Sequence, residues 1–201
     1  MQTNILLVRH GQTKWNLQQR LQGHKNSPLT AKGQQQARAV RHALHKFTIS
    51  KAYSSPLPRA LQTAEIITAE KNIPITLAAD LKEIRLGPWE GMTKQATALS
   101  HPEQYDFFWH MQDKFMLEGA ETFSQLRSRV VRCLDKIFHD NQGMNILVVS
   151  HWIAIKVAMA HYTTQPLARL SNIPDPGNGS YVMLTTTDTN QVTLDIPLPS
   201  K

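Results

Sequence analysis

Short runs of apolar residues alternate along the chain with stretches in which apolar residues recur at helical spacing. Ile5-Leu6-Leu7-Val8 and Ile146-Leu147-Val148-Val149 are continuously apolar, as strands are when both faces of a parallel sheet are covered. Strands that alternate with helices predict an α/β fold. We expect strands at residues 4–9, 52–54, 75–78 and 145–150, and a hairpin of residues 181–186 and 191–196 that turns through 187–190 and is followed by Pro197 and Pro199.

The longer stretches with helical periodicity predict helices at residues 34–47, 59–71, 121–140 and 151–161. In the third of them the apolar stripe extends from Phe123 to Ile137, and the polar and glycine residues that follow supply a stop signal. Gly33, beside the first helix, is a tolerable weak point. Cys133 lies on the apolar stripe, so we expect a buried, unreactive thiol.

The composition is that of a globular protein, with 201 residues of which 41% are hydrophobic and 18% charged. This length suffices for one well-filled core but not for two ordinary domains, so we expect a single domain over residues 1–201. The apolar stretches are much shorter than the roughly 20 residues of a membrane span. Met1 leads directly into a strand without a secretory leader, which favours a cytoplasmic location.

The net charge of +7 favours anionic ligands, whether phosphorylated metabolites or nucleic acid. The lysine and arginine residues are scattered, and no nucleic-acid-binding motif accompanies them. Charge alone does not choose between these ligands, and a generally basic surface explains it. We expect no nucleic-acid partner and no membrane partner. The sequence does not indicate the oligomeric state.

Three basic residues follow predicted strands directly or after a short loop. His10 and His151 come immediately after the two apolar runs, and Arg59 comes shortly after residues 52–54. Ligand sites in open α/β sheets lie beyond the carboxyl ends of the strands. These three side chains are therefore expected to converge at one edge of the sheet.

Their chemistry suits a phosphoryl group, whose charged oxygens are best bound by guanidinium and imidazole donors. Arg9, Arg59 and His151 supply those donors. His10 is a competent nucleophile near neutral pH, because an imidazole has an unperturbed pKa of about 6.5. Glu83 is a plausible proton donor to the leaving oxygen. The cationic groups stabilise charge, so neither a metal nor another cofactor is expected.

Each of these residues also has a plain structural interpretation. Taken alone, His10 after a strand is more often structural, and only its partners favour catalysis. Glu90 lies in the same segment as Glu83, and either carboxylate would ordinarily be solvated. His42 and His45 lack a third partner at metal-site spacing.

The aromatic segment 105–110 is most simply explained by packing, although its side chains have the chemistry to stack on nucleobases.

Five motifs occur in a fixed order. They are Val8-Arg9-His10-Gly11-Gln12-Thr13-Lys14-Trp15-Asn16, then Ser54-Ser55-Pro56-Leu57-Pro58-Arg59-Ala60-Leu61-Gln62-Thr63-Ala64, then residues 81–91, then Gly119-Ala120-Glu121-Thr122, and finally Val148-Val149-Ser150-His151. In this order the chain resembles the histidine phosphatase superfamily, the phosphoglycerate mutase-like enzymes. The resemblance covers most of the chain.

The resemblance implies a three-layer α/β fold with a mainly parallel sheet, one antiparallel strand and flanking helices. It implies that residues 92–120 form a helical cap over the active site, and from this we hypothesise an aromatic cap that includes Phe108 and Trp109. It also implies roles for the side chains: His10 as the phosphorylated nucleophile, Glu83 as proton donor and acceptor, Arg9, Arg59 and His151 around the phosphate, and Asn16, Gln22 and Gly23 as further substrate-binding positions.

Two positions depart from the family's pattern. Trp152 follows the second histidine where the family usually has a small residue, and its indole would either narrow the pocket, as a substrate-binding residue, or point into a helix interface. Ala120 stands where a second glycine is frequent, which is a mild change. Both concern substrate choice more than chemistry.

Within the family, the compact segment after Glu83 and the sequence Leu21-Gln22-Gly23 favour the phosphatase branch. We expect a metal-independent phosphatase that hydrolyses phosphate monoesters of small metabolites. The alternatives are phosphoryl transfer of the phosphoglycerate mutase type and a non-catalytic protein that binds a phosphorylated ligand.

Overall fold

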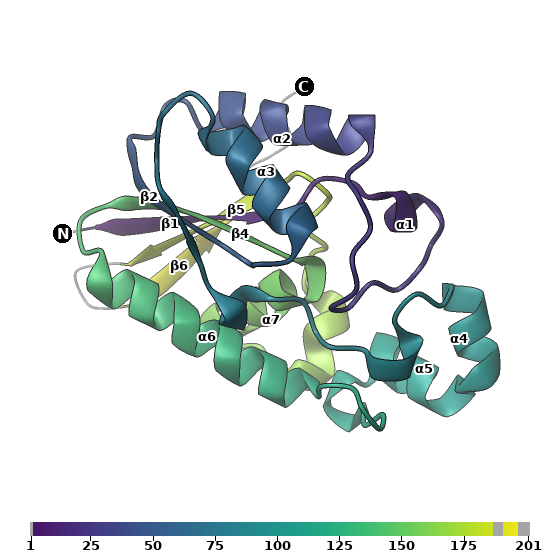
Figure 1. The fold of residues 1–201 in the computed structure, drawn as a ribbon. Coiled ribbons are helices and arrows are strands. Elements are labelled where there is room, and N and C mark those ends of the chain that lie inside the picture. The colour runs from purple at the N-terminus through teal and green to yellow at the C-terminus, as the bar shows by residue number, and fades with distance from the viewer. Residues whose placement is uncertain (1, 187–190, 197–201) are drawn as a thin grey trace.

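The computed structural model describes residues 2–186 and 191–196, and its strands form a single sheet in the order β3-β2-β4-β1-β5-β6 (Figure 1). Strands β1 to β4 are parallel to one another, β5 runs antiparallel to β1, and β6 runs antiparallel to β5. One strand, β5, therefore opposes the other described strands. The bounds are β1 Thr3–Arg9, β2 Ile49–Ser54, β3 Ile75–Leu77, β4 Asn145–Ser150, β5 Tyr181–Thr186 and β6 Val192–Asp195.

The centre of the sheet is apolar on both faces. Along β1, Ile5 and Leu7 pack into one core cluster, and Leu6 and Val8 pack into the other. The apolar residues of β4 alternate between the same two clusters. The continuous apolar runs therefore reflect a sheet covered on both sides, as the sequence predicts.

Helices cover the two faces in separate layers (Figure 1). The first layer contains α2 (Ala31–Ala43) and α3 (Pro58–Thr68), which pack against each other, with α3 on β2 and β4. The second contains α6 (Phe123–Asp140) and α7 (Trp152–Tyr162), which pack against each other and on β1. The expected three-layer fold with one antiparallel strand is confirmed.

The shorter helices gather beyond the carboxyl ends of the parallel strands, at the end of the molecule opposite the N-terminus (Figure 1). Helices α4 and α5 contact each other and lie within the segment expected to form a cap. The bounds are α1 Lys14–Leu17, α4 Lys94–Ser100 and α5 Pro102–His110, with 3-10 turns η1 Ala79–Leu81, η2 Gly87–Trp89, η3 Gln112–Lys114 and η4 Leu167–Asn172.

Capping side chains shift two helix boundaries from their expected places. Helix α2 starts at Ala31 rather than at residue 34, because the Thr30 hydroxyl accepts a hydrogen bond from the amide of Gly33. It also ends at Ala43, before residue 47. Helix α6 starts at Phe123 because Thr122 and Gln125 form a reciprocal capping box.

The interpretation of Gly33 as a mere weak point is wrong. A Cβ atom on Gly33 would lie 2.1 Å from the carbonyl oxygen of Gln12, and one on Gly11 would lie 2.3 Å from the carbonyl oxygen of Gly33. The two glycines thus allow the backbone after β1 to touch the start of α2. This contact fixes the segment that begins at His10.

The expected hairpin is present as β5 and β6, which pair antiparallel. Its turn at residues 187–190, together with Pro197 and Pro199, lies outside the described residues. Within residues 2–186 and 191–196, no helix is long and apolar enough to cross a membrane.

Candidate active site

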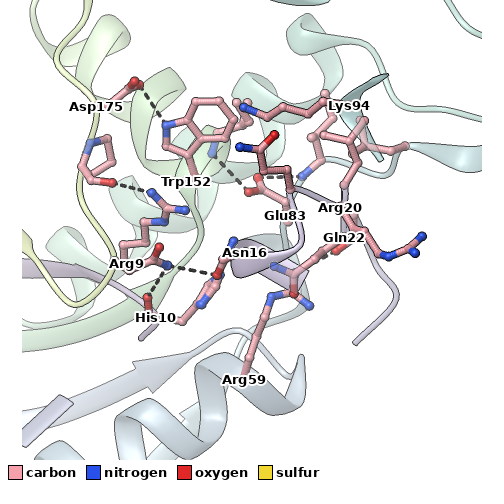
Figure 2. Close-up of a pocket in the computed structure, with 18 of the residues that line it drawn as sticks. Arg9, His10, Asn16, Arg20, Gln22, Arg59, Glu83, Lys94, Trp152 and Asp175 are labelled. Carbon is pink, nitrogen blue, oxygen red and sulfur yellow. Dashed lines mark hydrogen bonds between the residues drawn. The ribbon is translucent and has the colours of Figure 1, made fainter. Parts of the chain in front are cut away.

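A pocket of about 310 Å³ lies beyond the carboxyl ends of the parallel strands (Figure 2). Side chains from the loops after β1, from α3, from the segment after η1 and from the start of α7 converge on it. The sequence candidates that line it are Arg9, His10, Asn16, Gln22, Gly23, Arg59, Glu83 and Trp152.

His10 is held in one tautomer by its own loop. Its Nδ1 lies 2.7 Å from the carbonyl oxygen of Gly11, which accepts hydrogen bonds only, so Nδ1 carries the proton and Nε2 keeps its lone pair. Burial lowers the pKa of His10 well below its ordinary value, and the charges of Arg59 and Arg9 lower it further. The imidazole is therefore neutral and nucleophilic at neutral pH.

Two guanidinium groups line the pocket beside His10. Arg9 Nη1 donates to the carbonyl oxygen of Pro176 at 2.7 Å. Arg59, only 1% exposed, donates from Nη1 to Lys25 and from Nη2 to Gly23, each to the backbone oxygen at 2.8 Å. Burial lowers the pKa of both groups to about 10, so both stay cationic at neutral pH. They supply a fixed positive field for a phosphate.

Glu83 lies at the amino end of α7. Its Oε1 accepts hydrogen bonds from the amides of Ile84 and Ala154 at 3.0 and 3.1 Å, and its Oε2 accepts one from Ile153 at 3.2 Å. These amides at the helix terminus fix the orientation of a carboxyl group that is 8% exposed and lines the pocket. It lies between Arg9 and Arg20 in Figure 2.

Glu90, the alternative carboxylate, has a structural position. Its Oε1 accepts hydrogen bonds from the amides of His24 and Leu86, and it is not among the described residues that line the pocket. Of the two carboxylates, only Glu83 faces the space where a substrate would bind.

His151 lies beside His10 rather than at the pocket surface. The two ring centroids are 5.1 Å apart, and His151 is fully buried. Its Nε2 lies 2.8 Å from the hydroxyl oxygen of Ser55, and burial, Arg59 and His10 lower its pKa well below the ordinary value. The structure thus places His151 next to His10, beneath the residues that line the pocket.

The three further substrate-binding candidates differ in what they offer. Asn16 Oδ1 accepts hydrogen bonds from Thr13 and Asn178, which leaves its amide nitrogen as the donor available to the pocket. Gln22 Nε2 already donates to the Thr13 hydroxyl at 2.9 Å. Gly23 contributes its backbone, whose carbonyl oxygen positions Arg59.

Trp152 lines the pocket and does not point into a helix interface away from it. Its indole Nε1 donates to Asp175 Oδ1 at 2.9 Å, and the guanidinium carbon of Arg9 lies 5.8 Å from the ring centroid. On the side of the cap, its ring centroid is 5.5 Å from that of Trp109. The side chain therefore lies between Arg9 at the pocket and Trp109 of helix α5.

Several lining residues were not predicted from the sequence, notably Arg20, Lys94, Asp175 and Asn178. Asp175 and Asn178 belong to the loop before β5. Since β5 is antiparallel, its amino end lies at the edge where the parallel strands finish. A run of turn residues before an antiparallel strand would have been the signal for this loop.

Phe108 of the hypothesised aromatic cap lines the pocket, and the adjacent ring of Trp109 packs against it at 5.2 Å. Lys94, at the start of α4, places its ammonium group 4.4 Å from the Trp109 ring centroid. In Figure 2 its side chain extends toward Trp152. The cap thus contributes one aromatic and one cationic group to the pocket.

The remaining sequence candidates lie elsewhere. His42 and His45 stack on each other on α2 and its end, away from the pocket. Across the described ranges, no three His, Cys, Asp or Glu side chains are arranged to hold a metal ion. Cys133 is partly buried, and burial raises the pKa of its thiol to about 11.

The model of the histidine phosphatase superfamily (branch 1) matches residues 5–196. Phosphoglycerate mutase-like protein 4 of Arabidopsis thaliana is 37% identical over 73% of this chain, which spans 65% of that protein. The uncharacterized phosphatase PhoE of Bacillus subtilis is 35% identical over 76% of this chain and 74% of its own length. The solved structure of Bacillus stearothermophilus YhfR superposes with a TM-score of 0.93 at 32% identity, covering 96% of each chain.

The match to the family model extends over both strands that a histidine directly follows and over the helices that carry Arg59 and Trp152. The chain belongs to the histidine phosphatase superfamily, branch 1.

Proposed function

We propose that the protein hydrolyses phosphate monoesters of small metabolites through a phosphohistidine on His10. The observation that carries the proposal is the His10 imidazole, whose Nδ1 donates to Gly11 while Nε2 keeps its lone pair beside two guanidinium groups. A neutral nucleophile next to fixed positive charge is what attack on a phosphate dianion requires.

In the first step, Nε2 of His10 attacks phosphorus and the bond between phosphorus and the ester oxygen breaks. The protonated carboxyl of Glu83 gives its proton to the departing alkoxide. Arg9 and Arg59 stabilise the charge on the phosphoryl oxygens, and the Asn16 amide adds a neutral donor. The products are the free alcohol, a Glu83 carboxylate and phosphorylated His10.

In the second step, water attacks phosphorus on the side that the alcohol has left. The Glu83 carboxylate takes a proton from that water, and the bond between nitrogen and phosphorus breaks. The electron pair returns to Nε2, and inorganic phosphate leaves. His151 has a positioning role here, because its ring packs against His10 and its Nε2 is bound to Ser55.

No metal enters this scheme, since the two guanidinium groups supply the charge that a divalent cation would provide. Hydrolysis is therefore expected to continue in the presence of a chelator. Loss of activity that added Mg²⁺ restores would refute the metal-free mechanism.

The test of the function is release of inorganic phosphate from a panel of phosphorylated metabolites, with 4-nitrophenyl phosphate as a generic substrate. Hydrolysis that disappears in His10→Ala supports the proposal. Binding of phosphate without any turnover would instead support a protein that senses a phosphorylated ligand. The free Nε2 of His10 argues against that alternative.

Mutase activity is the second candidate, and the name of the Arabidopsis relative favours it. The two reactions differ in whether a second hydroxyl of the substrate or water receives the phosphoryl group. Incubation with 3-phosphoglycerate and a bisphosphoglycerate primer separates them. Rapid formation of 2-phosphoglycerate without free phosphate would overturn the phosphatase assignment.

Three further properties stay predictions. They are the cytoplasmic location, the absence of a nucleic-acid or membrane partner, and the single domain with a cap at residues 92–120. The contribution of Phe108 and Lys94 to the pocket supports the cap.

A further inference from the structure

A second, smaller cavity of about 130 Å³ lies next to the active-site pocket. We call it the side cavity, and the residues that line it include Phe108, Trp152, Ile153, Lys156, Leu170 and Asp175. Four of these residues, Phe108, Trp152, Ile153 and Asp175, also line the pocket. The two spaces therefore share a wall.

Trp152 is the part of this wall that a substitution can remove. Phe108, the other aromatic residue of the wall, is 2% exposed and packs edge-on against Trp89 and Phe115 in the core. Trp152 is only partly buried, and among aromatic rings it packs against Trp109. It is the first residue of α7, so the end of β4 directs it to the pocket.

The indole is fixed in place by polar contacts. Its Nε1 donates to Asp175, and Lys156 Nζ donates to the same carboxylate oxygen at 2.7 Å. The cations of Arg9 and Lys156 lie 5.8 and 5.9 Å from the ring centroid. These contacts on several sides keep the ring between the two spaces.

We propose that Trp152 sets the upper size limit for the alcohol part of the substrate, by closing the pocket off from the side cavity. The inference rests on the proposed phosphatase function. The pocket is at the small end of the range of about 300–1,000 Å³ for ligand sites, and the phosphate occupies part of it. The class of substrate is a phosphate ester of a compact alcohol.

The test compares phenyl phosphate with 1-naphthyl phosphate. Phenol and naphthol are leaving groups of similar acidity, so the pair differs mainly in size. The wild-type enzyme is expected to have the higher kcat/KM for phenyl phosphate. In Trp152→Gly the ratio of naphthyl to phenyl kcat/KM is expected to rise at least about tenfold, because the second ring enters the joined space.

Two matched variants separate the size effect from other losses. Trp152→Phe keeps an aromatic ring and is expected to give a smaller rise in the ratio. Leu170→Ala enlarges the side cavity without opening the shared wall, since Leu170 lines only that cavity, and is expected to keep the wild-type ratio. Trp152→Gly also removes the contact between the indole and the Arg9 guanidinium, which slows hydrolysis of both substrates. The ratio of the two kcat/KM values cancels this effect.

An unchanged ratio in Trp152→Gly would overturn the inference while leaving the phosphatase function intact. If the wild-type enzyme hydrolyses neither of these esters nor any member of the metabolite panel, the proposed function is wrong. The size limit is then decided by calorimetric Kd values for phenylphosphonate and 1-naphthylphosphonate, which need no turnover. If Trp152→Gly does not fold, Trp152→Leu replaces it in either measurement. The same naphthyl-to-phenyl preference in Trp152→Leu and the wild type would refute the proposed size limit.

Discussion

The guanidinium of Arg129 donates from Nη2 to the backbone carbonyl oxygen of Glu83 at 2.9 Å. Its Nη1 donates to the carbonyl oxygens of Asp80 and Lys82, and its remaining N–H groups bind the carboxylate of Glu121. A side chain on α6 therefore fixes the backbone of the segment that carries the proposed proton donor.

We predict that Arg129→Lys impairs proton donation more than phosphate binding, because an ammonium group cannot reach three carbonyl oxygens and a carboxylate in this geometry. On an alkyl phosphate, whose leaving oxygen needs a proton, kcat/KM should fall roughly 10- to 100-fold, because a misplaced acid loses part of the roughly 10²- to 10⁴-fold that general acid catalysis contributes. On 4-nitrophenyl phosphate, whose leaving group needs no proton, kcat/KM, which reports only the first step, should change little. Steady-state kinetics on both substrates measures the difference.

Glu83→Gln should show the same dependence on the leaving group in kcat/KM, which reports the first step, whereas its kcat should fall on both substrates because the second step lacks its base. Arg132→Lys is the matched control, because Arg132 lies on the same helix but is exposed and pairs only with the Asp80 side chain. An equal loss of kcat/KM on the alkyl phosphate and on 4-nitrophenyl phosphate in Arg129→Lys would mean that Arg129 has only a structural role.

A second prediction concerns stability at low pH. The pKa values of His10 and His151 are well below the ordinary 6.5 in the folded protein, chiefly because of burial. Below pH 6.5 the unfolded chain binds protons that the folded protein does not, so unfolding becomes easier. Each histidine should lower the free energy of unfolding by up to about 1.4 kcal/mol per pH unit, until the pH reaches its folded pKa.

Urea unfolding at pH 7.5 and 5.5 measures this loss. The loss should be smaller in His10→Asn, which removes one of the two groups. His139→Asn, at a side chain that is 83% exposed, serves as the control. Equal stability of the wild type at the two pH values would contradict the buried, neutral state of these imidazoles.

A third prediction concerns the contact between the loop after β1 and helix α2. In Gly33→Ala the new methyl group would meet the carbonyl oxygen of Gln12, so the two backbones must separate. We expect a loss of about 1–3 kcal/mol in the free energy of unfolding, as for other overpacked sites. Thermal or urea unfolding measures it.

Gly177→Ala is the matched control, since its methyl group would meet nothing closer than 3.9 Å. Wild-type stability of Gly33→Ala would show that the close approach is not required.

The sequence predicts the central strands well because their pattern is unambiguous. Residues 145–150 match β4 fully, since the apolar run is bounded by polar residues at both ends. Helix ends were less predictable. The start of α2 depends on the Thr30 cap, which outweighs the apolar spacing from which the helix was inferred.

The residues of the site also differ in how well the sequence predicts them. His10, Arg59 and His151 follow strands, and the carboxyl edge of a parallel sheet brings such residues together. Lys94 and Asp175 belong to segments whose position depends on how the chain folds back over that edge. The turn residues before β5 could have marked the loop of Asp175, but nothing in the local sequence marks Lys94, and only the three-dimensional structure reveals that either side chain lines the pocket.

The central claim is that His10 carries the phosphoryl group, and the Glu83→Gln variant with 4-nitrophenyl phosphate tests it most directly. With 4-nitrophenyl phosphate the first step needs no acid, so the variant still phosphorylates His10. The second step lacks its base because Gln replaces Glu83, so phosphorylated enzyme should accumulate.

The measurement is rapid quenching with ³²P-labelled substrate, followed by peptide mapping. We predict one equivalent of label on His10, stable in base and lost in acid, and no label in the variant that also has His10→Ala. Turnover without a labelled enzyme, or label at another residue, would contradict the account.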